Sequence, residues 1–173
     1  MTAIAIARTY LRAGNWDAET DSVTLDYESR FLRRRRLVTA GGMPLLVDLA
    51  ETVSIEDGDA LVIEGGGLVA VRAASEPLIE VCAQGEILAR LAWHVGNRHT
   101  PAQILPGALR LRRDRVMADM LIRLGAVICE IEAPFTPEGG AYGHGRTHGH
   151  HHGGAEDDPH HHHRHAANAT ESG

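Results

Sequence analysis

Ten of the twelve histidines in this 173-residue chain lie between His144 and His165. Neutral imidazole is the commonest protein ligand for borderline divalent metals, and His-rich tracts are typical of metal binding. Glycines, the acidic Glu156-Asp157-Asp158 and Arg164 interrupt the stretch, whereas a purification tag would be a clean run. We therefore predict a natural metal-binding tail with the ligands His144, His148, His150, His151, His152, His160, His161, His162, His163 and His165.

The remaining two histidines stand in the segment His94-Val95-Gly96-Asn97-Arg98-His99. Two helical ligands share one face at a spacing of four, but here the spacing is five and Gly96-Asn97 is a helix stop. His94 is therefore expected to cap or pack at a helix end, with a secondary metal site as the alternative. His99 is expected to open a strand on an exposed junction, where a twofold axis would bring two copies to one ion.

Composition excludes several classes of protein. The formal charge of −6 argues against general nucleic-acid binding, and no apolar run is long enough for a membrane span. The first residues read as a strand and not as a signal peptide, so we expect a cytoplasmic protein. The chain contains no lysine, which excludes a Walker-type nucleotide site, and no H-E-x-x-H motif. We therefore predict that the protein is not an enzyme.

Two features leave alternatives open. Cys82 and Cys129 have apolar neighbours, so buried core thiols are favoured over soft metal ligands. The basic run from Arg33 to Arg36 is either a solvated stretch or a patch for an anion or a partner, and the solvated reading is favoured.

Short apolar segments separated by turns organise the first part of the chain. Residues 36–40 and 45–49 flank Gly41-Gly42-Met43-Pro44, and residues 61–64 and 68–73 flank Gly65-Gly66-Gly67. Such spacing predicts several short strands in a small sandwich or barrel. We assign residues 1–74 to an all-β domain, which is a candidate for partner binding.

The spacing of the apolar residues changes after residue 74. Strands are predicted at 78–83, 99–105, 108–112 and 126–131, with one helix through Ile87 to Val95 and another capped by Asp114 and closed by Gly125. The order βαββαβ is the ferredoxin-like arrangement, with Cys82 and Cys129 on adjacent strands. The fold class is therefore α+β, with a second domain at 75–136 for metal binding and dimerisation. The tail, residues 137–173, lacks core periodicity and is predicted to be disordered without metal.

Several segments together resemble one known family. HVGNRHTPAQ, DRVMADMLIRLGA and APFTPEGGAYGHG are similar to the UreE family of urease accessory nickel metallochaperones, as is the earlier ESRFLRRRRLVTAGGMPLLVDLAETVSIEDGDALVIEGG. The resemblance implies a homodimer that binds Ni²⁺ at the subunit interface through His99 and passes it to the urease apoprotein and to accessory proteins that include a GTPase. Some members carry two histidines around an Asp where this chain has Arg113-Asp114-Arg115, so those peripheral sites are not expected here.

Two functions therefore compete. A nickel carrier would capture ions with the tail and present one at the His99 pair, whereas a divalent-metal buffer or storage protein would need only the tail. Imidazole ligands alone do not select nickel, because Cu²⁺ binds such sites more tightly and Zn²⁺ about as well. Zn²⁺ and Cu²⁺ are therefore also expected to bind.

Overall fold

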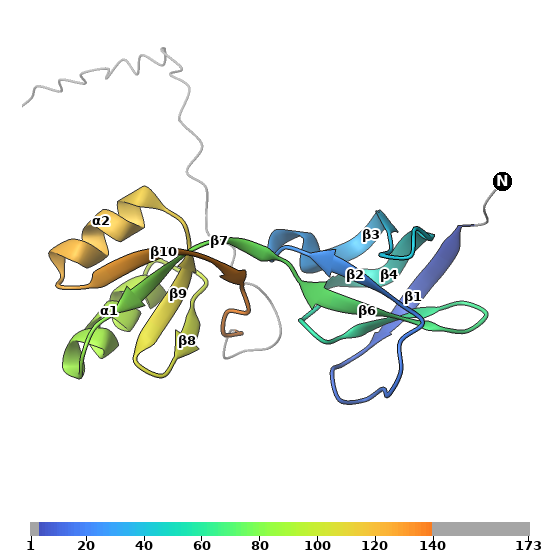
Figure 1. Cartoon of the computed structure of the whole chain (residues 1–173), viewed down its shortest axis with the longest axis horizontal. Helices are drawn as coiled ribbons and strands as arrows, with labels where there is room; N and C mark the ends of the chain where they lie inside the picture. The colour runs from blue at the N-terminus through green and yellow to red at the C-terminus, as the bar shows by residue number, and fades with distance from the viewer. Residues whose placement is uncertain (1–3, 140–173) are drawn as a thin grey trace, which may run out of the picture.

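The computed structural model describes residues 4–139, which form two sheets placed end to end (Figure 1). The first sheet has six strands in the order β2-β6-β5-β1-β4-β3. β1 runs parallel to β4, and β2 runs parallel to β6, while the other pairs are antiparallel. The elements of this part are β1 (Ala5–Leu11), β2 (Asp21–Leu25), the 3-10 helix η1 (Glu28–Arg30), β3 (Phe31–Val38), β4 (Pro44–Ser54), β5 (Ala60–Ile63) and β6 (Leu68–Ala73).

This N-terminal sheet curls into a half-barrel. The predicted glycine turns do join its strands: Gly42 has a φ of 84°, and β5 and β6 pair as the expected hairpin. Alternate residues of these strands face the core, and many of them are buried, among them Val23, Leu45 and Val69. The curl brings the β3–β4 turn to β2, where the Ala40 backbone N–H donates to the Ser22 carbonyl at 2.8 Å.

The second sheet belongs to a βαββαβ unit, as predicted. Its strand order is β10-β7-β9-β8, with β8 and β10 at the edges. Helices α1 and α2 both pack on one face of it, where their apolar side chains meet Val81, Leu109 and Leu111. The elements are β7 (Ser75–Cys82), α1 (Glu86–Gly96), β8 (Gln103–Leu105), β9 (Ala108–Arg112), α2 (Arg115–Arg123) and β10 (Val127–Pro134).

The largest error in a predicted boundary of this unit concerns the strand before β9. We expected a strand from His99 to Leu105, but β8 begins only at Gln103. The backbone N–H groups of Arg98 and His99 donate instead to carbonyls in the last turn of α1. Residues 97–99 therefore extend the helix end as a tight turn, because the last carbonyls of a helix need donors and the following segment supplies them.

A small apolar cluster joins the two sheets. It consists of Tyr27 from the N-terminal part, Leu78 from β7 and Phe135, which directly follows β10. The Tyr27 and Phe135 rings meet edge to face with centroids 5.2 Å apart. Beside them the buried guanidinium of Arg30 donates from Nη2 to the Phe135 carbonyl oxygen. The junction thus holds the end of β10 against the N-terminal half-barrel.

Candidate metal centre

His99 lies in an unusual backbone conformation at the end of α1. Its φ of 52° makes it the one non-glycine residue with positive φ among residues 4–139. Its backbone N–H donates to the Gly96 carbonyl at 2.9 Å, which holds the turn in place. L-residues avoid this left-handed region, although histidine tolerates it better than most, and strained residues of this kind cluster at functional sites. The turn leaves His99 exposed.

His94 occupies the last turn of α1 and is half-buried. Its ring meets the Trp93 ring edge to face at a centroid separation of 5.0 Å, and its carbonyl accepts from Arg98 Nη1 at 3.0 Å. These contacts support the expected packing role at the helix end.

Within residues 4–139, no three His, Cys, Asp or Glu side chains come together in a way that could hold a metal ion. A divalent transition metal in a protein usually takes four or more ligands. A site at His99 therefore has to be completed from elsewhere, either by a second copy of the chain or by the tail. The ten predicted tail ligands and the predicted disorder of the tail lie outside the described residues, since the description ends at Gly139.

The start of the tail is anchored beside the His99 turn. After Phe135 the chain turns to the opposite edge of the second sheet, where the Glu138 backbone N–H donates to the Ala102 carbonyl at 2.8 Å. Sequence reasoning missed this segment, because we treated all residues after 136 as tail. Phe135 was the available signal, since it is a large apolar side chain in an otherwise polar stretch.

The segment Arg113-Asp114-Arg115 has a structural role. Asp114 is the N-cap of α2, as predicted, and its carboxylate accepts from the Met117 backbone N–H at 2.6 Å. Arg113 forms an ion pair with Glu130 on β10 at 3.1 Å. Arginine has no lone pair to offer a metal ion, and the one carboxylate of the segment is already engaged.

The prediction of two buried core thiols is wrong. Cys82 is half-buried and Cys129 is exposed, and both are free. They do lie on adjacent strands, but Cys82 is opposite Val127 and Cys129 is opposite Glu80. The register puts both on the sheet face that α1 and α2 do not cover, since Val81 and Ile128 occupy the covered face. Apolar neighbours in sequence misled the prediction, because on a strand the next residue points to the other face.

Comparison with known proteins decides the family. The family model "UreE urease accessory protein, N-terminal domain" matches residues 2–74, and the model "UreE urease accessory protein, C-terminal domain" matches residues 76–166. The chain belongs to the UreE family of urease accessory proteins. The urease accessory protein of Ruegeria pomeroyi is 55% identical over 143 residues, which cover 83% of this chain and 95% of that protein.

Two further relatives carry the same description. The urease accessory protein of Paracoccus denitrificans is 58% identical over 134 residues, covering 78% of this chain and 82% of that protein. The one from Rhodobacter capsulatus is 49% identical over 150 residues, covering 87% of this chain and 94% of that protein.

Membership in the family confirms the resemblance drawn from the sequence motifs and connects the chain with urease maturation. The family consists of accessory proteins and not of enzymes, in agreement with the prediction from the missing catalytic motifs. Among the described residues, no helix is long and apolar enough to cross a membrane.

Proposed function

We propose that this protein is a cytoplasmic nickel metallochaperone, which binds Ni²⁺ as cargo and delivers it to the urease apoprotein and its accessory complex, a GTPase included. The observation that carries the proposal is the position of His99. An exposed imidazole on a left-handed turn is preorganised for a ligand. Within the described residues, however, too few other ligand side chains lie near it to hold a metal ion without a further contribution.

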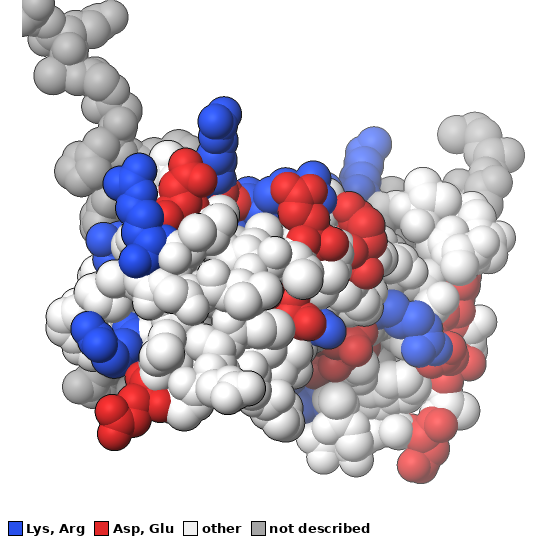
Figure 2. Space-filling model, turned by 60° about the vertical axis from the view of Figure 1, so that its left-hand side comes forward, with Lys and Arg blue, Asp and Glu red and all other residues white. Residues whose placement is uncertain are grey.

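A homodimer would complete that site, and the outer face of α1 supports this arrangement. A helix on a protein surface normally turns charged or polar residues to water. α1 exposes the charged Glu86 and Arg90, but beside them Ala89, Trp93 and Gly96 are also exposed at spacings of four and three, with 63% of Trp93 exposed. Figure 2 shows a broad uncharged area on the side of the molecule that it views, with charged side chains at the margins. A second copy packed there would place two His99 turns close to one twofold axis.

The anchored start of the tail supports transfer between the two predicted sets of ligands. Glu138 is held at Ala102, three residues after His99 in the sequence. The first tail histidine, His144, follows six residues after Glu138, which is about 20 Å of extended chain at roughly 3.3 Å per residue. A tail imidazole can therefore reach the proposed interface site, which suits capture by the tail and presentation by His99.

A nickel titration with mass measurement in solution tests the proposal. Truncation after Gly139 should keep the fold and the dimer, because residues 4–139 contain both cores, and should lose most bound ions with the ten histidines. His99→Ala should remove one further ion per dimer from the truncated chain. The full-length His99→Ala protein should load metal through its tail but fail to activate urease.

The same titration separates the carrier from a metal buffer. A buffer needs only the tail, so truncated His99→Ala protein would then bind nickel as tightly as its truncated parent, and urease activation would survive the substitution. His94→Ala is the matched control, because it removes an imidazole of the same helix end that we assign to packing against Trp93. It should leave the number of bound ions unchanged.

A further inference from the structure

Strand β3 presents a free edge lined with arginines. It is the last strand of the N-terminal sheet, so only one of its sides is paired. Within the described part of the chain, the backbone of residues 34–38 forms ladder hydrogen bonds with β4 alone. The other side therefore offers a row of N–H and C=O groups to solvent or to a further strand.

The four arginines from Arg33 to Arg36 are all exposed and are poorly compensated. Arg34 lies 3.7 Å from Asp48, but Arg8 shares that carboxylate at 3.5 Å. Arg35 donates to the Ser29 carbonyl at 3.4 Å. Neither Arg33 nor Arg36 has an ion pair or hydrogen bond to any residue between 4 and 139. In a chain of net charge −6, this strand is a concentrated positive stripe, and within the described residues the fold engages only Arg34 and Arg35 of it.

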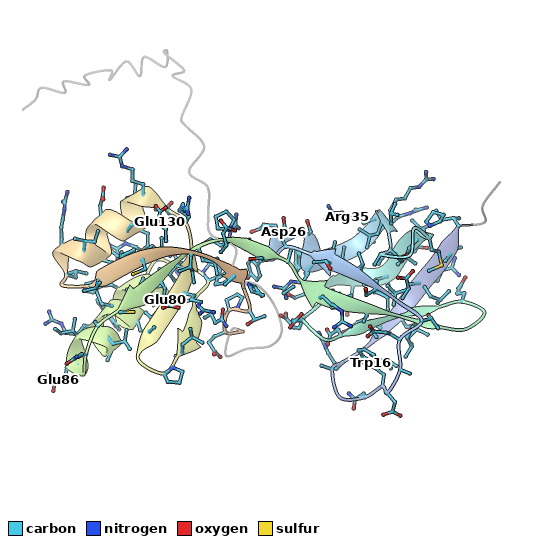
Figure 3. The ribbon with its side chains drawn as sticks, viewed as in Figure 1. Trp16, Asp26, Arg35, Glu80, Glu86 and Glu130 are labelled. Atoms are coloured by element: carbon cyan, nitrogen blue, oxygen red, sulfur yellow. The ribbon has the colours of Figure 1, made fainter. Side chains whose placement is uncertain are left out.

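The arginines point to both faces of the sheet. Arg35 is opposite Val47, which faces the core, whereas Arg34 and Arg36 are opposite Asp48 and Leu46 on the outer face. Arg35 lies at the upper rim of the N-terminal sheet (Figure 3). The strand ends in Val38, an apolar side chain that is 66% exposed. The edge thus combines open backbone groups, cations on both sides and an apolar end.

We propose that β3 docks an extended acidic segment of a partner protein, which adds to the sheet as a seventh strand. Backbone pairing at an open edge gives such a segment its affinity, and alternate side chains give it specificity. Carboxylates on both faces of the added strand would meet Arg34 and Arg36 on one side and Arg35 on the other. The proposal is independent of the proposed metal site, whose ligand His99 lies in the turn after α1 in the other part of the molecule.

A protein segment fits this edge better than a nucleic acid does. Phosphates would meet the arginines, but because they only accept hydrogen bonds they would leave the open C=O groups of β3 unpaired, and stacking would need aromatic side chains beside the arginines. The strand contains one aromatic residue, Phe31, which is half-buried at its start. The alternative within protein chemistry is edge protection, in which the charges only prevent the sheets of two molecules from pairing.

The test uses the full-length protein and the capped peptide Val-Glu-Glu-Val-Glu-Glu-Val, which presents glutamates on both faces of an extended strand, with binding measured by fluorescence anisotropy at low salt. We expect binding that is lost when alternate peptide nitrogens are methylated, because methylation removes the donors of one peptide edge. Replacing both unpaired arginines (R33T/R36T) should weaken binding about tenfold, since each exposed ion pair contributes up to roughly 1 kcal/mol. The control R115A/R123A removes two exposed charges from α2 and should leave the affinity unchanged.

Four results would overturn the proposal. The first is that the parent protein has no affinity for the peptide, and the second is that the N-methylated peptide binds as well as the unmodified one. A single-stranded oligonucleotide of equal charge that binds as tightly, with the same loss in R33T/R36T, would indicate a general anion patch. If R33T/R36T instead binds the peptide like the parent but aggregates, the arginines serve only to protect the edge.

Discussion

At the scale of single residues, His99 combines two properties that separate substitutions can distinguish. Its side chain is the proposed ligand, and its backbone has a φ of 52°. Only glycine adopts this region without a steric penalty, which arises between Cβ and the following carbonyl oxygen. The position therefore retains a histidine at some cost in stability, as expected where a residue serves binding.

We predict different effects on stability for two substitutions at this position. His99→Gly should raise the free energy of unfolding by about 0.5–1 kcal/mol, because glycine relieves the strained φ. His99→Ala keeps the Cβ and should change stability by no more than about 0.5 kcal/mol. Both should lose the interface ion. Denaturant unfolding without metal measures the free energy of unfolding of both variants. A glycine variant that is less stable than the alanine variant would contradict the prediction.

At the scale of elements, α2 depends on a single side-chain cap. The Asp114 carboxylate satisfies the Met117 N–H, which would otherwise lack a partner at the start of the helix. Asp114→Ala should therefore lower the free energy of unfolding by about 1 kcal/mol. Arg115→Ala, one residue later, should lie within about 0.5 kcal/mol of the parent. Neither change should alter the number of bound ions in a nickel titration; loss of an ion in Asp114→Ala would make this segment a metal site.

The turn between β3 and β4 depends on a second carboxylate. Asp21 accepts hydrogen bonds from the Thr39 side chain and from the backbone N–H groups of Ser22 and Gly41, and these bonds hold its pKa below the usual 3.8, the Thr39 bond most strongly. A carboxyl whose folded pKa is depressed stabilises the fold above its unfolded pKa and loses this contribution as the pH falls through the folded value. The contribution of Asp21 should therefore begin to decline below about pH 4 and be lost once the pH is below the folded pKa.

Asp21→Asn tests this dependence. The amide cannot ionise, so the variant should be less stable than the parent at pH 6, and the difference should shrink as the pH falls below about 4. Thermal unfolding midpoints between pH 6 and pH 2.5 measure both curves. A gap between parent and variant that stays constant over this range would show that ionisation of Asp21 does not matter. Asp17→Asn serves as the control in the neighbouring exposed loop.

At the scale of the whole molecule, Arg30 connects the two sheets. Its side chain is 1% exposed, donates to the Phe135 carbonyl oxygen and lies 3.4 Å from Glu56. Its guanidinium carbon lies 5.8 Å from the centre of the Tyr27 ring. Arg30 Nε has no hydrogen-bond partner among the described residues. Burying a cation with an unsatisfied donor costs free energy. We infer that Arg30 positions the two sheets and the start of the tail through its contacts at the junction.

Arg30→Ala should lower the free energy of unfolding by about 2–4 kcal/mol, because it opens a cavity and leaves the Phe135 carbonyl without its donor. It should also release the segment after Phe135, which proteolysis near Thr136 would detect. Arg112→Ala is the control, since Arg112 crosses the same junction to Glu28 but is half exposed. That pair should contribute no more than about 1 kcal/mol, and equal losses for the two variants would argue against a special role for Arg30.

Local patterns in the sequence were sufficient for most elements and for their order. Glycine turns, alternating apolar residues and the Asp114 cap depend on neighbours within a few positions, and they predicted both sheets and both helices. The prediction of a metal-binding tail also rests on local sequence, since the affinity expected of a dense run of imidazoles does not depend on the fold, and it stays a prediction. The motifs around His99 were specific enough to indicate the family that the comparisons confirmed.

Tertiary structure decided what depends on contacts between distant residues. The sequence showed four arginines in a row, but only the strand order places them on a free edge. It showed two cysteines among apolar neighbours, but sheet pairing turns both away from the helices. Likewise, Arg30 and Phe135 are 105 positions apart, and no local pattern predicts their contact or the return of the tail to Ala102. Side-chain burial and pairing across a sheet are properties of the assembled chain, because each requires a partner that the local sequence does not contain.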